Sequence, residues 1–200
     1  MTITYPVKNN LYINITNRCP CSCTFCLRNN GESVFGSGNL WLEHEPTYEE
    51  ICQSIDSFEL NNYNEIVFCG YGEPTERLDI LLETAKYIKA KSDIKIRLNT
   101  NGLSDLIYNE KTAYKFETLI DTISISLNAT NKDNYFKLVR PKFGICSYDS
   151  MLNFAKDCKK YIPNVVMTIV DVVTSKEEQV KCKQICDNLG VKLRIRPFEN

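Results

Sequence analysis

Thr122-Ile-Ser-Ile-Ser-Leu-Asn128 decides the fold of this chain, because its side chains alternate strictly between apolar and polar. Ile123, Ile125 and Leu127 fall on one face of a predicted strand, and the Thr, Ser and Asn side chains fall on the other. The same alternation runs through three further segments: 12–16, 94–99 and 193–196. A parallel strand covered by helices on both faces would be apolar throughout. The pattern therefore predicts one face under helices and one face lining a polar cavity, rather than a sheet with a bare solvent face.

Strand-like and helix-like segments alternate along the whole chain, without a linker or low-complexity segment between them. Capping boxes at Thr47–Glu50 and Ser175–Glu178 begin two of the predicted helices, and Gly190 ends the last one. The predicted strands are 11–16, 65–70, 94–99, 122–128, 165–172 and 192–197. Six strands joined through helices form a parallel sheet with right-handed crossovers.

The length of the chain then helps to distinguish between folds that contain a parallel sheet. An eight-fold barrel takes about 250 residues, and this chain has 200. A doubly wound open sheet would fit the length, but it would not explain the polar strand faces. We therefore expect an α/β fold, a partial (βα)6 TIM-like barrel of parallel strands with outer helices, built as a single domain over residues 1–200.

Composition limits the classes of function. Lys and Arg total 24 against 25 for Asp and Glu, which argues against nucleic-acid binding through a broad basic field. No apolar run reaches the length of a membrane span, and the first residues lack a signal-peptide core. Ten cysteines without a secretion signal indicate a reducing compartment, so we expect a cytoplasmic protein that does not enter a membrane.

Four of the ten cysteines lie in one loop, as Cys19, Cys21, Cys23 and Cys26. Such crowding is typical of a metal or cluster site. The spacing Cys19-x3-Cys23-x2-Cys26 offers three thiolates, and three ligands on a four-iron cluster leave one iron open, as catalytic sites do. If Cys21 were a fourth ligand, the site would be closed, as in an iron–sulfur electron carrier or a zinc module.

Three motifs together resemble the signature of the radical SAM superfamily. The first is the cysteine loop, with Phe25 before its last cysteine; the second is Phe68–Pro74, which is similar to the family's Gly-Glu-Pro segment. The third is Thr100-Asn-Gly102 at a strand end. The resemblance covers essentially the whole chain. Further segments, among them 39–47 and 140–144, are similar to the short TatD-associated radical SAM proteins, a group named for its genomic association with metal-dependent nucleases.

The resemblance implies a chemistry. Cys19, Cys23 and Cys26 would hold a [4Fe-4S] cluster whose open iron binds S-adenosylmethionine (SAM). An electron donor such as flavodoxin or ferredoxin would reduce the cluster, which cleaves SAM to methionine and a 5′-deoxyadenosyl radical. That radical abstracts hydrogen from a substrate that the sequence does not identify.

The resemblance also implies a set of SAM-binding residues, each at a position that matches a family motif or a strand end. Phe25 would lie near the adenine, and Gly70, Tyr71, Gly72 and Glu73 would face the methionine ammonium. Asn99, Ser126, Asn128 and Arg140 would serve the ribose hydroxyls and the carboxylate. Tyr71 replaces a glycine that many family members have at its position.

Residues outside these motifs lead to further expectations. Arg97, Arg194 and Arg196 would line the barrel, where they would suit an anionic substrate unless acids pair with them. Cys69 would point toward the helices, and His44 would lie in a surface loop. The cysteines outside the loop fit core packing, although a second cluster could draw on four of them: Cys146, Cys158, Cys182 and Cys186.

Several functions stay open within the radical SAM reading. One is an activase that installs a glycyl radical on a partner enzyme, and another is a ring-remodelling enzyme like the deazapurine synthases. An electron carrier or a zinc module belongs to a different class. The chain ends just after its sixth predicted strand, so we expect a protein substrate or a second copy of the chain to cover the barrel mouth.

Overall fold

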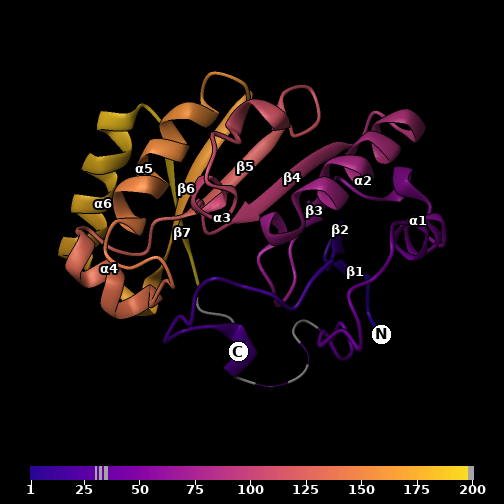
Figure 1. The fold of residues 1–200 in the computed structure, drawn as a ribbon, viewed down its shortest axis with the longest axis horizontal. Helices are drawn as coiled ribbons and strands as arrows, with labels where there is room; N and C mark the ends of the chain where they lie inside the picture. Colours follow the sequence, from indigo (N-terminus) through magenta and orange to yellow (C-terminus); the bar gives the residue numbers. More distant parts are fainter. Residues whose placement is uncertain (30, 32, 34–35, 198–200) are drawn as a thin grey trace.

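The computed structural model describes residues 1–29, 31, 33 and 36–197, and its centre is one curved seven-stranded sheet (Figure 1). The strands are β1 (Thr4–Val7), β2 (Asn10–Ile13), β3 (Glu65–Phe68), β4 (Lys95–Thr100), β5 (Thr122–Ser126), β6 (Asn164–Val170) and β7 (Lys192–Arg196). Strands β2 to β7 run parallel, each beside the next strand in the sequence. Because β1 and β7 form the two edges of the sheet, the barrel is open, and the predicted partial barrel is confirmed.

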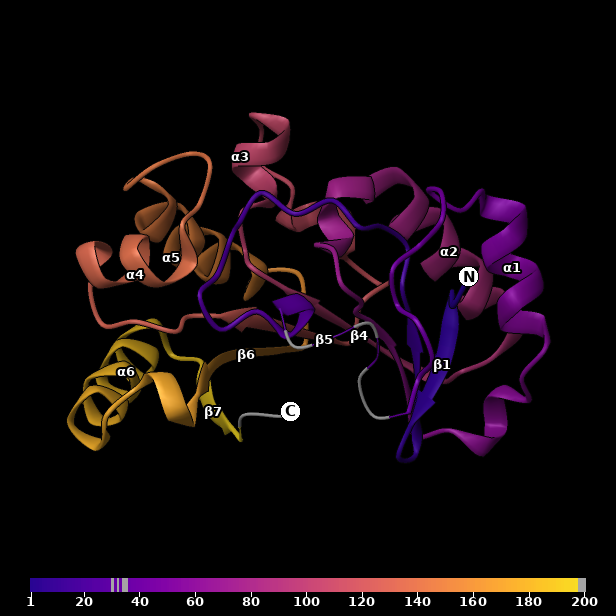
Figure 2. The ribbon, with the colours of Figure 1, turned by 90° about the horizontal axis from the view of Figure 1, so that it is seen from below.

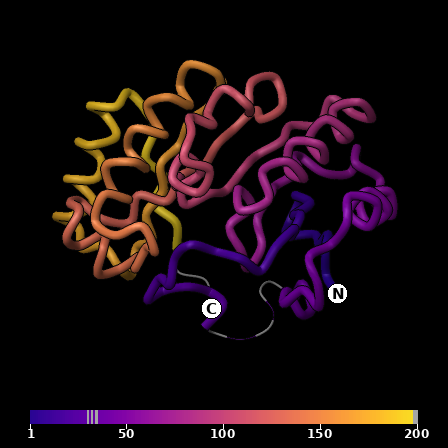
Figure 3. Tube along the Cα trace, viewed as in Figure 1, coloured from indigo at the N-terminus to yellow at the C-terminus, as the bar shows by residue number. Residues whose placement is uncertain are grey.

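The helices cover the outer side of this sheet, as the Cα trace in Figure 3 also shows. They are α1 (Tyr48–Asp56), α2 (Leu78–Lys91), α3 (Ser104–Tyr108), α4 (Lys132–Val139), α5 (Ser147–Cys158) and α6 (Lys176–Leu189). Short 3-10 turns are η1 (Leu27–Asn29), η2 (Leu60–Asn62), η3 (Pro74–Arg77), η4 (Ala113–Phe116) and η5 (Asp171–Val173). Both predicted capping boxes form, and Gly190 ends α6 with a φ of 67°. None of the described helices has the length and apolar composition that crossing a bilayer demands.

The strand faces divide as the alternation predicts. Ile96 and Leu98 on β4, like Ile123 and Ile125 on β5, are fully buried in the layer between sheet and helices. The other face of β5 carries Ser124 and Ser126, whose side chains border a cavity. Burying the apolar face drives the helices onto one side of the sheet, and the polar face is left to line the interior of the open barrel.

Strand β1 is an element that the sequence pattern does not predict. It pairs antiparallel with β2, from Thr4 opposite Ile13 to Val7 opposite Asn10. Pro6 argues against a strand because proline cannot donate to a ladder, but β1 is an edge strand, where proline is tolerated. Lys8 has a φ of 53° in the two-residue turn, as tight hairpins require.

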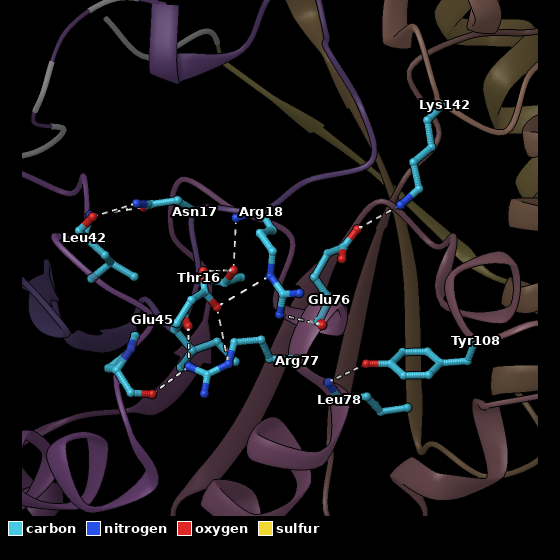
Figure 4. A network of polar contacts seen from close by, with 12 residues as sticks. Thr16, Asn17, Arg18, Leu42, Glu45, Glu76, Arg77, Leu78, Tyr108 and Lys142 are labelled. Carbon is cyan, nitrogen blue, oxygen red and sulfur yellow. Dashed lines mark hydrogen bonds and ion pairs between the residues drawn. The ribbon is translucent and has the colours of Figure 1, made fainter.

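The cysteine loop follows β2, and Glu45 fixes its root (Figure 4). Thr16 donates its hydroxyl to Glu45 Oε1 at 2.8 Å, and the guanidiniums of Arg18 and Arg77 lie 3.6 and 3.4 Å from Glu45 Oε2. Arg77 also donates to the carbonyls of Ile15 and Pro46 at 3.0 and 2.7 Å. This network joins the start of the loop to the segment before α1 and to η3.

The far end of the cysteine loop is held by the other half of the barrel. Ser22 and Thr24 donate their backbone amides to the carbonyls of Val139 and Leu138, at 3.1 and 2.9 Å. Figure 2 shows the indigo loop crossing from β2 toward α4. The loop therefore connects β2, the first parallel strand, to the helix that follows β5, the fourth, and lies over the open interior.

Gly72 is where the segment after β3 touches the root of this loop. A Cβ atom at Gly72 would lie 2.2 Å from the carbonyl oxygen of Thr16 and 2.7 Å from that of Arg18. The next residue, Glu73, donates its amide to the same Arg18 carbonyl at 2.8 Å. Two backbones are in direct contact here, so only glycine fits.

We predict that Gly72→Ala destabilises the protein by about 3 kcal/mol or more, because the new methyl group meets backbone atoms that cannot rotate away. Urea unfolding followed by circular dichroism measures the change. Gly144→Ala is the control: no atom lies within 4 Å of its Cβ position, and only its φ of 78° opposes alanine. That strain costs about 1–2 kcal/mol, and equal losses in the two variants would contradict the contact argument.

Candidate functional site

A cavity of about 260 Å³ lies at the carboxyl ends of the strands, where barrel enzymes place their active sites. The cysteine loop forms one side of it, and the residues that end β3 to β7 form the other. Its lining includes the four loop cysteines and the segment from Cys69 to Pro74. Motifs from distant parts of the sequence therefore meet around one space.

The four loop cysteines differ in their surroundings. Cys19, Cys23 and Cys26 are half-buried, whereas Cys21 is 3% exposed. The Cys21 thiol contacts both Cys19 and Cys23; hydrogen bonding to these two neighbours raises its pKa, and the same bond lowers the pKa of Cys19. Cys21 also accepts a hydrogen bond from the Asn101 side-chain amide at 3.6 Å, so its sulfur already has partners within the chain.

The donor set fits an iron–sulfur cluster. Thiolates are the ligands that such clusters use, and all four cysteines line the cavity, three of them half-buried. Within the described ranges, no three His, Cys, Asp or Glu side chains are grouped closely enough to hold one metal ion. An iron–sulfur cluster takes its cysteine ligands on several different irons, so this loop could supply three or four of them.

Glu73 is buried beside the cavity, and its carboxylate accepts four hydrogen bonds. Thr75 donates both its amide and its hydroxyl, at 3.1 and 2.8 Å, and the Thr100 hydroxyl and the Asn101 amide donate at 2.7 Å each. Burial raises the pKa of Glu73, and these donors oppose that shift because they favour the carboxylate. Glu73 thus joins the ends of β3 and β4.

The neighbouring residues of this segment have packing roles. A Cβ at Gly70 would lie 2.0 Å from Oδ1 of Asn14, the residue after β2, so a side chain at this position would displace Asn14. Tyr71 donates its hydroxyl to the Gly31 carbonyl at 2.8 Å, and its ring meets Trp41 edge-on at 5.1 Å. Tyr71 therefore ties the segment to the chain that follows the cysteine loop.

The other expected SAM-binding residues divide into two groups. Phe25, Asn99, Ser126 and Asn128 all line the cavity. Asn128 is 3% exposed, and its Oδ1 atom has no hydrogen-bond partner. Arg140 is different: it ends α4 with a φ of 48°, is exposed, and lies outside the cavity lining.

Tyr135 is a cavity residue that the sequence analysis does not single out. It lies on α4, is 1% exposed, and its hydroxyl has no hydrogen-bond partner. Burial raises its pKa, and Cys21 and Cys23 are close enough to add to that shift. Tyr135 and Val139 share a helix face, a pattern that in sequence is the same as a core stripe.

The three arginines have unequal partners. Arg97 is 6% exposed and pairs with Glu65 at 2.8 Å, so for this residue the alternative of pairing with an acid is confirmed. Arg194 and Arg196 do line the cavity. Arg194 donates to the Ser124 hydroxyl at 3.1 Å.

The side chain of Cys69 lies on the opposite face of the sheet from the one that the sequence predicts. We expect it to face the helices, but it lines the cavity and its carbonyl accepts the Tyr5 hydroxyl at 3.1 Å. Val67 pairs in register with Arg97, and since side chains alternate with a period of two, Cys69 belongs on the interior face.

The remaining cysteines and the histidine have structural surroundings. Cys158, Cys182 and Cys186 are fully buried in the core, and Cys146 is exposed. Core packing therefore accounts for Cys158, Cys182 and Cys186, as expected. His44 is exposed and contacts Glu50 at 3.0 Å, outside the cavity.

Two kinds of enzyme are similar in sequence. GTP 3′,8-cyclase of Lactiplantibacillus plantarum is 30% identical over 130 residues, which cover 64% of this chain and 36% of that protein. A protein of Methanocaldococcus jannaschii described as a glycyl-radical enzyme activating enzyme is 26% identical over 187 residues, or 91% of this chain and 63% of that one. The chain thus spans less than two thirds of the length of these relatives.

Solved structures share the fold. SuiB of Streptococcus suis, bound to its precursor peptide SuiA, superposes with a TM-score of 0.66 at 17% identity, covering 96% of this chain and 39% of SuiB. Methylornithine synthase (PylB) gives a TM-score of 0.64 at 17% identity, covering 94% of this chain and 53% of its own. Both likenesses concern the arrangement of the strands and helices.

The family model described as the radical SAM superfamily matches residues 13–181. That range includes the cysteine loop, the Gly70–Glu73 segment and the Thr100–Gly102 turn, which the structure brings together around one cavity. Motifs, fold and family model agree, and the chain belongs to the radical SAM superfamily.

Proposed function

We propose that this chain is the core domain, residues 1–200, of a radical SAM enzyme whose cavity holds both cofactors. Members of the superfamily use a [4Fe-4S] cluster and SAM. One observation carries the proposal: Cys19, Cys23 and Cys26 share a cavity with the Gly70–Glu73 segment and the polar strand ends. When bound, the cofactors supply a carbon radical that takes hydrogen from a substrate.

The residues of the chain have separate tasks in this proposal. Cys19, Cys23 and Cys26 hold the cluster, while Glu73 fixes the strand ends around it through hydrogen bonds within the chain. The unpaired Oδ1 of Asn128 offers an acceptor to a SAM hydroxyl or ammonium. Phe25 and Val139 add apolar surface that keeps water from the reacting atoms.

Two substrate classes remain within this chemistry. The Methanocaldococcus relative favours an activase that acts on a partner enzyme, because it matches 91% of this chain. The cyclase relative favours turnover of a free heterocycle, as in the deazapurine-synthase reading. A stable complex with a large protein would support the first, and conversion of a free heterocycle would support the second.

The subgroup, the cellular compartment and the partners of the enzyme are part of the same proposal. We assign the chain to the TatD-associated group on its sequence motifs, and to the cytoplasm because all ten cysteines are free. Radical SAM enzymes need a reductant, for which flavodoxin or ferredoxin is our candidate. A protein substrate or a second copy would cover the exposed side of the cavity, where Arg194 meets solvent.

Replacing any one of Cys19, Cys23 or Cys26 with Ala removes a cluster ligand. After anaerobic reconstitution, each variant should hold less iron and, with dithionite and SAM, produce 5′-deoxyadenosine more than about 100-fold more slowly than the wild type. Changes outside the ligand shell cost only about 10–100-fold. Wild-type protein that reconstitutes its iron but never cleaves SAM would contradict the proposal.

Cys21→Ala separates a radical enzyme from an electron carrier. Cys21 is buried between Cys19 and Cys23 and is not assigned as a ligand, so the variant should keep its iron and its 5′-deoxyadenosine production within a few-fold. A carrier that uses all four cysteines would instead lose its cluster. Iron content and the visible absorption spectrum distinguish the two outcomes.

Asn128→Gly tests the SAM site without straining the backbone, because glycine readily adopts the φ of 54° found at Asn128. We expect SAM to bind about tenfold more weakly to the reconstituted variant, as for the loss of one hydrogen bond worth about 1.4 kcal/mol. Asn109→Gly is the matched control, with a φ of 52° at an exposed helix end. Equal affinities in equilibrium dialysis would remove Asn128 from the site.

A further inference from the structure

The last strand brings two guanidiniums to the cavity that the cofactor chemistry does not use. Arg194 and Arg196 both belong to β7 and point to the same side of it. Arg194 donates to the Ser124 hydroxyl, while the buried Nε of Arg196 has no hydrogen-bond partner. Neither arginine forms an ion pair with any residue that the structure describes.

The charge on this wall is therefore unbalanced. Arg97 lies nearby, but Glu65 neutralises it at 2.8 Å. Desolvation and the neighbouring charges of Arg97 and Arg196 lower the pKa of Arg194, as expected where cations are crowded together. Among these three guanidiniums, the two on β7 therefore have no carboxylate partner among the described residues.

Hydroxyl groups lie beside these charges. Ser126, Thr168 and Arg194 occupy one row across β5, β6 and β7, and all three line the cavity. Thr168 is 2% exposed. A bound oxyanion could therefore accept hydrogen bonds from hydroxyls as well as from guanidiniums.

SAM itself does not match this wall. Its sulfonium and ammonium groups outweigh its single carboxylate, so the cofactor is a net cation that two unpaired arginines repel. The wall suits an anion, and two uncompensated charges suit a dianion. A phosphate monoester carries about −1.5 to −2 charges at pH 7 and offers three acceptor oxygens.

We propose that Arg194 and Arg196, with the hydroxyls of Ser126 and Thr168, bind a phosphate group of the substrate. This inference rests on the proposed function, because it takes the cavity to be the active site. It names the substrate as a phosphorylated molecule whose anionic end lies against β7, so that its remaining part extends toward the cysteine loop on the other side of the cavity.

The experiment is an anaerobic calorimetric titration of the reconstituted protein, with SAM present, using inorganic phosphate as the probe. Arg194→Gln and Arg196→Gln should each weaken phosphate binding about tenfold, and the double variant about a hundredfold. Lys192→Gln is the matched control, since Lys192 lies on the same strand but outside the cavity. It should change affinity less than twofold.

A second titration uses malonate, whose two carboxylates also give it a double negative charge. Phosphate that binds more tightly than malonate, in a manner that depends on the arginines, supports the inference. No phosphate binding by the wild type, unchanged binding by the double variant, or tighter binding of malonate overturns it.

Measuring 5′-deoxyadenosine in the same wild-type preparation separates this inference from the proposed function. SAM cleavage without phosphate binding rejects the phosphate site alone. Phosphate binding without SAM cleavage rejects the radical function and leaves an anion site on β7.

Discussion

The buried carboxylate of Glu73 is the interaction on which the site depends. Its four hydrogen bonds draw the ends of β3 and β4 together, and its own amide holds the root of the cysteine loop through Arg18. A carboxylate without these donors would be costly in so apolar a place. The family motif that contains Glu73 is thus a structural joint between three strand ends, whatever ligand lies beside it.

The cavity has two chemically different sides. One side is sulfur-rich and borders on Tyr135 and Asn128, whose buried polar atoms have no partner within the chain. The opposite wall is cationic. An enzyme that joins a cationic cofactor to a second molecule gains from such a division, because each wall attracts one reactant and repels the other. Charge, more than shape, would then decide which molecule binds to each side of the cavity.

Sequence reasoning succeeded where a pattern corresponds to one physical cause. Strict alternation in 122–128 requires two unlike strand faces, and the structure shows an apolar face in the core and a polar face at the cavity. Sequence reasoning failed, or left alternatives open, where the position of a side chain depends on a residue in a neighbouring strand. Arg97 meets Glu65 only across a strand pair, and the face of Cys69 follows from register with β4. Pro6 argued against a strand at β1, although proline is tolerated at a sheet edge. Tyr135 lines the cavity from a helix, where its spacing in the sequence is the same as that of a core residue.

The anchoring of the cysteine loop also bears on how the chain assembles. Each parallel strand pairs with the next one along the chain, so the sheet can grow as the sequence is synthesised. The loop is an exception, because the carbonyls of Leu138 and Val139 that fix it belong to a helix more than half the chain away. The loop cysteines are made early but are fixed only once α4 is in place, so under the proposed function cluster insertion follows the folding of α4 rather than the emergence of the cysteines.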